Sequence, residues 1–144
     1  MNTHSNALDQ LGGISTKILE SYEIFAKNHH LNGNELAILY ALWVYQARTQ
    51  KQIADEYLIA KQTINTLCKK YEADGIIQST ASDNDKREKI LHLTQKGQAF
   101  ARPIIETLLN QENKIIDEFG TKRMAFLLDE FMQLQQLMAQ TLER

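Results

Sequence analysis

The sequence is poor in cysteine, proline and glycine. With a single cysteine, Cys68, the chain cannot form an intrachain disulfide or a Cys-x-x-Cys redox or zinc site. One proline and six glycines in 144 residues favour long helices over a β-sandwich with many turns. No apolar run approaches the roughly 20 residues that a membrane-spanning helix needs, and residues 1–10 lack the basic and apolar segments of a secretory signal. We therefore expect a cytoplasmic protein without membrane contact.

The overall composition is that of an ordinary globular protein. Hydrophobic residues make up 43% and charged residues 24% of the chain, which excludes wholesale disorder. A chain of this length forms one compact domain, or a small domain with dimerising arms. The formal net charge is −2, but residues 48–102 hold 10 Lys/Arg against 7 Asp/Glu. A mildly basic middle suits a surface that meets phosphates, although random scatter of surface charge gives similar counts.

Two capping boxes mark helix starts in the first half of the chain. Asn32-x-x-Glu35 precedes a helix with apolar side chains on one face, and Thr49-x-x-Gln52 precedes a shorter helix. After a turn of about three residues, a further helical pattern runs to Gly75, a residue suited to a left-handed C-cap. Two short helices with this separation have the spacing of a helix-turn-helix.

The pattern changes after this helix-turn-helix. Residues 76–81 and 88–93 alternate as strands do, and the turn-forming residues 82–85 join them. Residues 94–119 return to helical spacing, and Pro103 inside them predicts a kink or a restart of the helix. The predicted fold is therefore mainly α with a small β-hairpin wing, that is, a winged helix-turn-helix flanked by terminal helices.

The outward face of the second short helix is free of carboxylates. At 3.6 residues per turn, Ile64, Leu67, Cys68 and Tyr71 cluster on one side of this helix. The other side collects amides, hydroxyls and lysines, which pair with base edges and phosphates. An ordinary surface helix would mix acidic residues into such a face, so we favour a DNA-reading helix over a merely solvated one. The predicted DNA contacts are Thr49, Lys61, Gln62, Thr63, Asn65, Thr66 and Lys69.

The predicted hairpin carries Asp85, Lys86 and Arg87 at its tip. An arginine on a narrow, projecting hairpin can enter an A·T-rich minor groove, where the negative potential is enhanced. We predict that Lys86 and Arg87 contact DNA there, and that Asp85 supports the tip or orients Arg87 by a charge-assisted hydrogen bond. A charged turn alone is usually part of the solvated surface. The position of this turn after a helix-turn-helix supports a role in DNA binding.

Five segments of the sequence resemble one family of regulators. They are Thr49-Gln-Lys-Gln-Ile-Ala, Lys61-Gln-Thr-Ile-Asn-Thr-Leu, Asp74-Gly-Ile-Ile, Asp85-Lys-Arg and Leu91-His-Leu-Thr-Gln-Lys-Gly97. In this order they are similar to the MarR family of bacterial winged-helix regulators, and the Asp-x-Arg wing followed by Leu-x-Leu-Thr-x-x-Gly is a fairly specific signature. The resemblance implies a homodimer on a pseudo-palindromic operator, commonly a repressor that a small effector releases.

Long amphipathic helices are predicted at both ends. The first spans residues 8–25, with or without an interruption at Gly12-Gly13, and the last carries an apolar stripe from Met124 to Leu142. An exposed stripe of this length marks an interface, unless it packs on its own domain. Two copies joined there would present two reading helices at the spacing of a two-fold site. The predicted domains are an N-terminal dimerisation helix (1–33), a winged helix-turn-helix (34–100) and C-terminal dimerisation helices (101–144).

Other residues that could carry chemistry lie in weaker patterns. Cys68 lies on an apolar face and is predicted to be a core residue rather than a thiol sensor. His29 and His30 diverge on a helix, so surface histidines are favoured over a metal site shared with Glu23 or Glu106. The sequence has no Gly-rich phosphate loop, HExxH or GxSxG, so we predict no enzyme, no cofactor and no metal site. The aromatic residues that would line an effector pocket, if they are not simply core, are Tyr22, Phe25, Tyr40 and Trp43.

Two functions from different classes stay open at this point. The favoured function is that of a dimeric transcriptional regulator whose partners are double-stranded DNA, a second copy of the chain and a small-molecule effector. The alternative is a helical protein–protein adaptor with a winged-helix fold that does not bind DNA. The salt dependence of binding to duplex DNA distinguishes the two.

Overall fold

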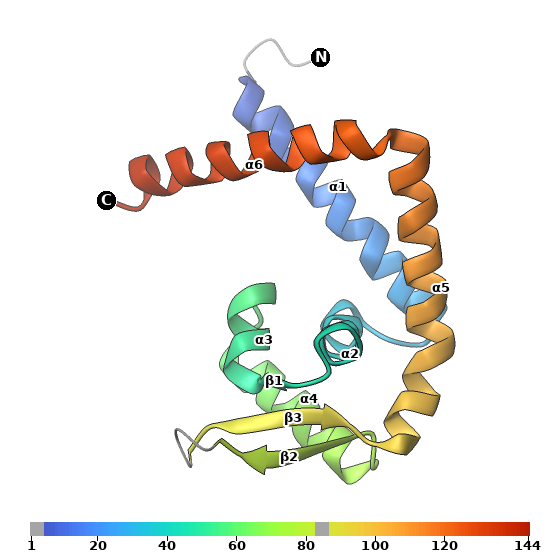
Figure 1. The fold of residues 1–144 in the computed structure, drawn as a ribbon. Coiled ribbons are helices and arrows are strands. Elements are labelled where there is room, and N and C mark those ends of the chain that lie inside the picture. Colours follow the sequence, from blue (N-terminus) through green and yellow to red (C-terminus); the bar gives the residue numbers. More distant parts are fainter. Residues whose placement is uncertain (1–4, 83–86) are drawn as a thin grey trace. The chain divides into compact units, whose positions relative to one another are not determined.

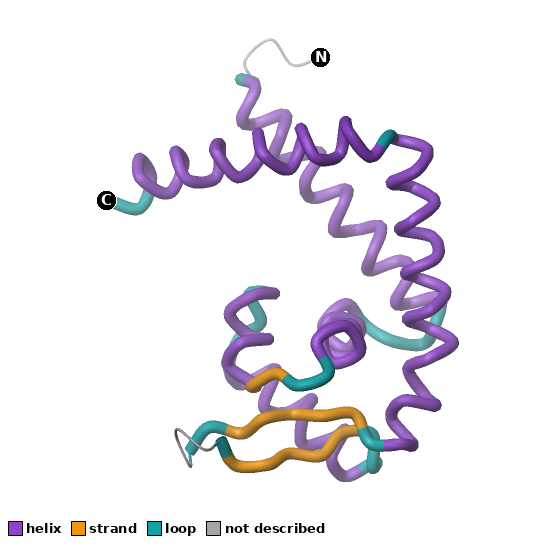
Figure 2. Tube along the Cα trace, viewed as in Figure 1, coloured by secondary structure: helices purple, strands orange, loops and turns teal. Residues whose placement is uncertain are grey.

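The computed structural model describes residues 5–82 and 87–144, which form six helices and three short strands (Figures 1 and 2). The chain divides into two compact units, residues 1–105 and 106–144. This division does not test the predicted boundaries after residues 33 and 100, which stay predictions. The fold class is confirmed as mainly α with a winged helix-turn-helix. The elements are α1 (Ala7–Asn28), α2 (Gly33–Tyr45), β1 (Arg48–Thr49), α3 (Gln50–Tyr57), α4 (Lys61–Ala73), β2 (Ile77–Ala81), β3 (Lys89–Leu93), α5 (Gln95–Phe119) and α6 (Thr121–Leu142).

Both predicted capping boxes are present. At the start of α2, the Asn32 side chain accepts a hydrogen bond from the Glu35 amide at 2.9 Å, and Glu35 Oε1 accepts one from the Asn32 amide at 3.1 Å. Thr49 and Gln52 make the same reciprocal pair at the start of α3, at 3.0 and 2.9 Å. Each box satisfies backbone donors that the first turn of a helix leaves unpaired. Helices α2 and α3 therefore begin at the positions that the sequence predicted.

The core of the first unit is built around α2, which lies against α1, α3 and β3 (Figure 1). Sequence spacing predicted one apolar face on this helix, and that prediction was too narrow. Ile38 and Leu42 are fully buried, whereas Tyr40 and Trp43 on the same helix are only half-buried. A helix buried on most of its circumference needs apolar residues all round, so its spacing carries little directional information. The largest fully buried side chains of the described residues are Ile38, Leu39, Leu42, Ile53, Ile64, Leu91 and Ile105.

The sheet has three antiparallel strands in the order β1-β3-β2. The predicted hairpin of β2 and β3 is present, with Ile77 paired to Leu93 and Ser79 to Leu91. The sequence did not predict β1, which pairs Arg48 with Leu91 on the other side of β3. A strand of two residues is too short to show alternation, so sequence pattern could not reveal it.

The segment after β3 fixes the start of α5. Thr94 Oγ1 accepts a hydrogen bond from the Gly97 amide at 2.9 Å and donates one to the carbonyl oxygen of Gly75. A Cβ atom at position 97 would overlap the carbonyl oxygen of Ile76, so glycine is required there for space. Thr94-x-x-Gly97 therefore forms the start of α5 and joins it to Gly75, the residue that follows α4. From there α5 continues through Pro103 as one helix, without the restart that proline allowed.

The N-terminal helix α1 is unbroken through Gly12 and Gly13. Near its other end, the Glu23 carboxylate accepts a hydrogen bond from the backbone amide of Gly33 at 3.0 Å. A Cβ atom at position 33 would overlap this carboxylate. A side chain at position 33 would therefore have to displace the exposed Glu23 carboxylate.

Candidate nucleic-acid interface

Helix α4 turns its polar side to solvent. Ile64, Cys68 and Tyr71 are 1–3% exposed and hold the opposite side of the helix against the core. The only carboxylate of α4, Glu72, is half-buried in its last turn. We call the exposed side the reading face. Its members are Lys61, Gln62, Thr63, Asn65, Thr66 and Lys69, all of which are exposed.

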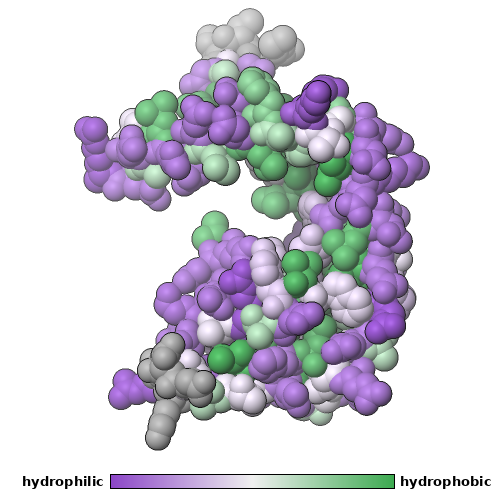
Figure 3. All heavy atoms as spheres, in the orientation of Figure 1, coloured by the Kyte–Doolittle hydropathy of each residue, from purple (hydrophilic) through white to green (hydrophobic). Residues whose placement is uncertain are grey.

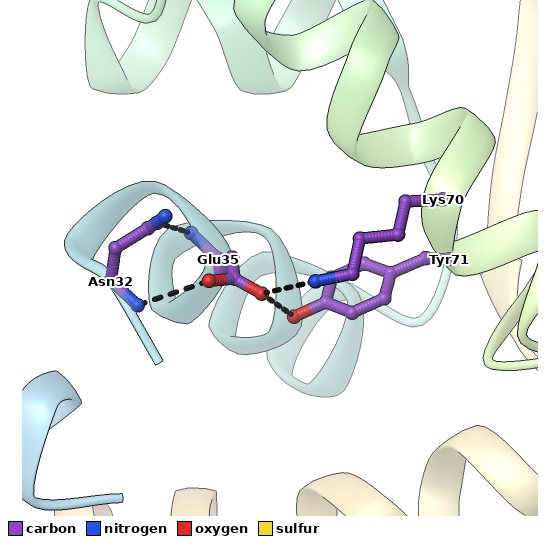
Figure 4. Close-up of polar contacts among 4 residues, drawn as sticks. All are labelled: Asn32, Glu35, Lys70 and Tyr71. Carbon is purple, nitrogen blue, oxygen red and sulfur yellow. Dashed lines mark hydrogen bonds and ion pairs between the residues drawn. The ribbon is translucent and has the colours of Figure 1, made fainter. Parts of the chain in front are cut away.

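Glu35 ties α4 to the start of α2 (Figure 4). While Oε1 of this carboxylate closes the capping box, Oε2 accepts a hydrogen bond from the Tyr71 hydroxyl at 3.1 Å and lies 3.7 Å from Lys70 Nζ. The Glu35 side chain is only 12% exposed, so these contacts lie in partly desolvated surroundings. Burial and the neighbouring Glu35 carboxylate raise the pKa of Tyr71 above its ordinary value, which keeps the hydroxyl protonated as a donor. A polar contact therefore links the helix that carries the reading face to the start of α2.

The N-terminus of α4 has no side-chain cap. Its N-cap residue is Ala60, and the preceding turn places Leu58 in the left-handed region with φ of 51°. The first turn of α4 carries Lys61 and no acidic residue. The positive end of the helix dipole and Lys61 therefore lie at the same end of α4, which favours a negative group there.

A cavity of about 630 Å³ lies between the helix-turn-helix and the base of the wing. It brings together three predicted contact residues, Lys61, Asn65 and Arg87. It also includes Lys51 and Lys89, which sequence reasoning missed. Lys89 follows Arg87 by two positions at the start of β3, so the two-residue period of a strand could have found it. The cavity lies between the reading face and the wing and carries both signs of charge, because Asp55 and Glu88 also line it and Lys51 Nζ lies 2.8 Å from Asp55 Oδ2.

Not every predicted contact residue belongs to this surface. Thr49 is buried, with 9% exposure, and its hydroxyl is used to cap α3. A capping threonine and a DNA-contacting threonine look alike in sequence, and the structure places this one inside. Asp85 and Lys86 lie outside the described residues.

The four aromatic residues predicted for an effector pocket lie on α1 and α2. Tyr22 is exposed on α1, and the Phe25 ring stacks on His29 with centroids 4.2 Å apart. Tyr40 and Trp43 are half-buried on α2, and of the four only Trp43 lines the cavity of about 700 Å³ beside the sheet. The effector pocket formed by these four residues stays a prediction.

Cys68 is a core residue, as predicted. It is 3% exposed, and burial raises the pKa of its thiol to about 11. In residues 5–82 and 87–144, no group of three or more His, Cys, Asp or Glu side chains is placed to hold a metal ion. None of the described helices is long and apolar enough to cross a membrane.

Both terminal helices carry apolar side chains on their surfaces, which Figure 3 shows in green over α1 and α6. In α6 no residue is buried, although the helix is rich in leucine and methionine. Surfaces of this kind are unusual in a monomer and mark contacts with other molecules. The exposed large apolar residues are Leu8, Ile14, Ile18, Leu19, Tyr22 and Ile24 on α1, and Phe126, Leu128, Met132, Leu137 and Leu142 on α6.

The fold and the reading face define a winged-helix protein with an exposed, carboxylate-free second helix in its helix-turn-helix. Residues 31–89 match the MarR family. The solved structure of NMB1585, a MarR family regulator from Neisseria meningitidis, is 32% identical and superposes with a TM-score of 0.87. The match covers 96% of this chain and 98% of that one. The chain belongs to the MarR family, as its motifs predicted.

Two curated relatives are also named as transcriptional regulators. HTH-type transcriptional regulator PetP of Rhodobacter capsulatus is 38% identical over 48 residues, which are 33% of this chain and 29% of PetP. HTH-type transcriptional regulator Hpr of Geobacillus thermodenitrificans is 25% identical over 114 residues, which are 78% of this chain and 57% of Hpr. The chain thus matches less than two thirds of the length of either relative. The family is one of transcriptional regulators and not a class of enzymes.

Proposed function

We propose that this protein is a sequence-specific DNA-binding regulator that acts as a homodimer, most simply as a repressor on a two-fold operator. The observation that carries the proposal is the reading face of α4, an exposed surface of amides, hydroxyls and lysines without a carboxylate. Three buried side chains on the opposite side of α4 hold this surface toward solvent. Its relatives are named as transcriptional regulators, which agrees with this chemistry.

Each group of the reading face suits a part of the duplex. The amides of Gln62 and Asn65 can pair with adenine in the major groove, and the lysines can meet guanine or phosphate. The Thr66 hydroxyl donates a hydrogen bond to the Gln62 carbonyl oxygen at 2.9 Å. This leaves the threonine methyl group for contact with a thymine methyl. Arg87 and Lys86 of the wing would reach the adjacent minor groove.

Phosphate contacts would add affinity around the reading face. Lys51, Lys61 and Lys89 line the cavity between α4 and the wing, and α4 itself begins there without an acidic residue. Each lysine that neutralises a phosphate releases counterions, so binding weakens as salt rises. With Arg87, these lysines outnumber the two acidic residues of the cavity, Asp55 and Glu88, which supports phosphate binding despite the net charge of −2.

Dimerisation would use the apolar surfaces of α1 and α6. Joining two copies removes these side chains from water, and a two-fold axis presents two reading faces to two half-sites. Light scattering on a sizing column should give twice the mass of 16.6 kDa. Replacing Phe126 and Met132, which are 68% and 60% exposed, by aspartate should shift the protein toward monomer. A wild-type monomer at micromolar concentration would contradict the dimer.

The test of DNA binding begins with selection of bound sequences from a random duplex pool. A recovered two-fold motif supports the regulator, and its affinity is then measured by fluorescence anisotropy against salt. We expect log K to fall linearly with log salt, and Lys69→Ala to reduce the slope by about one. Asn65→Ala should instead relax sequence preference at one position, by about 1–3 kcal/mol.

A matched control separates local contacts from general charge. Lys114→Ala also removes one exposed lysine, which lies on α5 and has only a surface ion pair with Glu118 at 4.0 Å. Its salt slope should equal that of the wild type. Absent or salt-insensitive binding by a folded dimer would favour the alternative, a protein–protein adaptor. A response to a small effector is also part of the proposal.

A further inference from the structure

Two acidic side chains line the cavity between the helix-turn-helix and the wing, beside the carboxylate-free reading face. Asp55 lines it from α3, and Glu88 lines it from the base of the wing. Both residues have a fixed backbone, because Asp55 lies inside a helix and the Glu88 carbonyl oxygen accepts a hydrogen bond from the Ser82 amide at 2.9 Å. The charged residues of the lining are Lys51, Asp55, Lys61, Arg87, Glu88 and Lys89. The cavity therefore presents negative charges at set places among basic ones.

The contact between Asp55 and Lys51 contributes little to the stability of the fold. Lys51 Nζ lies 2.8 Å from Asp55 Oδ2, one turn away on the same helix, and the two side chains are 77% and 65% exposed. Exposed ion pairs of this kind contribute little to folding, because water and salt screen them. Folding therefore does not explain a carboxylate at a cavity with four basic residues.

Lys51 brings the two carboxylates into one electrostatic group. Its hydrogen bond to Asp55 raises the pKa of Lys51, and the Glu88 carboxylate adds to the same effect. Glu88 is therefore near enough to Lys51 to act on the same bound phosphate as Asp55.

A surface with both signs of charge distinguishes between orientations of a bound duplex. Contacts with base edges fix one docked orientation on a preferred sequence, whereas binding to other sequences is electrostatic and samples many orientations. A uniformly basic surface attracts phosphates in all of these orientations. A carboxylate adds repulsion wherever a phosphate comes to lie beside it, so it weakens some orientations more than others. Repulsive groups of this kind are one way in which a protein rejects unwanted partners.

We propose that Asp55 and Glu88 are specificity-determining residues that weaken binding to unrelated duplexes more than binding to the preferred site. In the docked orientation, the basic side chains of the cavity meet phosphates and the two carboxylates stay clear of them. In other orientations, a phosphate beside either carboxylate lowers the affinity by like-charge repulsion. This role rests on the proposed function, because it requires DNA at the reading face.

The test compares two duplexes of equal length, the selected sequence and a scrambled sequence of the same base composition. Fluorescence anisotropy at one salt concentration gives both affinities, and the affinity for the selected duplex divided by that for the scrambled one is the specificity ratio. Asp55→Asn and Glu88→Gln each remove one negative charge and keep a side chain of similar size. Each should lower the specificity ratio at least about threefold, by strengthening binding to the scrambled duplex. A ratio that is unchanged or higher in either variant would overturn the role of that residue.

The matched control is Glu118→Gln on α5. Glu118 also belongs to an exposed ion pair one helical turn long, with Lys114 at 4.0 Å, and its replacement changes the net charge by the same amount. Both affinities of this variant should change by the same factor, so its specificity ratio should equal that of the wild type. An equal fall of the ratio in Glu118→Gln and Asp55→Asn would mean that net charge alone acts, and would overturn the proposal.

The double variant Lys51→Gln/Asp55→Asn separates repulsion of phosphates from release of Lys51. If Asp55 repels phosphates, the double variant keeps the lowered specificity ratio of Asp55→Asn, with weaker binding to both duplexes. A ratio restored to the wild-type value would show that Asp55 acts by restraining Lys51, which contradicts the proposal. If the folded wild type binds neither duplex, the proposed function fails and this role fails with it. If the wild type binds the selected duplex and neither single variant lowers the ratio, only the role of the two carboxylates fails.

Discussion

Replacing Tyr71 by phenylalanine removes one hydroxyl and leaves the buried ring in place. The hydroxyl donates to Glu35 Oε2 at 3.1 Å, and Tyr71 is 3% exposed. A hydrogen bond to a charged acceptor contributes about 1.5–3 kcal/mol. The carboxylate keeps Lys70 at 3.7 Å and its place in the capping box, so it is not left without partners. We therefore expect a loss near the lower end, about 1.5–2 kcal/mol.

A double-mutant cycle with Glu35→Gln isolates this interaction. Glutamine retains the acceptor that the capping box needs and removes the charge that Tyr71 meets. The free energies of unfolding come from urea titrations followed by circular dichroism, at one protein concentration because a dimer makes stability concentration-dependent. We expect a coupling energy of about 1 kcal/mol between the two positions. Tyr45→Phe, at a tyrosine that is 45% exposed, is the control and should change stability by less than about 0.5 kcal/mol. A coupling energy of zero would mean that water replaces the bond without loss.

Gly97→Ala should destabilise the protein by about 1–3 kcal/mol, because its Cβ would overlap the Ile76 carbonyl oxygen. Gly12→Ala should stabilise α1 by about 0.5–1 kcal/mol, because nothing lies within 4 Å of the added Cβ atom. Urea titrations in which Gly97→Ala and Gly12→Ala shift the unfolding midpoint in the same direction would refute this. Burial raises the pKa of the Cys68 thiol from 9.0 to about 11. At pH 8 this thiol should react with iodoacetamide at least about 100-fold more slowly in the native protein than in urea. Equal rates in the two conditions would contradict its burial. Because its folded pKa lies above the unfolded one, the stability that this thiol contributes is complete below pH 9 and is lost as pH rises from 9 to about 11. Thr49→Ala should cost about 1 kcal/mol of stability through loss of the α3 cap, measured by thermal unfolding, and Thr49→Ser should restore most of it.

The parts of the fold that could be predicted are those with local signals. Asn32 and Thr49 predicted the starts of α2 and α3, because a capping box lies within four residues of sequence. The end of α4 could be predicted from Gly75, whose φ of 74° is the left-handed conformation that glycine adopts just after a helix. The reading face followed from helical spacing alone, since Ile64, Cys68 and Tyr71 mark the buried side.

The remaining features depend on contacts between distant residues. Tyr71 and Glu35 are 36 positions apart, and no sequence pattern links a tyrosine to a capping glutamate at that distance. Thr49 was predicted as a DNA contact, but it is only 9% exposed and its hydroxyl caps α3, and sequence alone does not reveal that burial. The cavity beside Trp43 gathers residues from four elements, so it exists only after the chain has folded.

The short strand β1 makes β3 the central strand of its sheet instead of an edge strand. Thr49 belongs to β1 and also caps α3, so the ladder to β3 and the first turn of α3 share one residue. We therefore expect a displacement of the wing strands to be transmitted to the first turn of α3. Amide hydrogen exchange in β3 and in the first turn of α3 should consequently proceed through a common opening event rather than through separate ones.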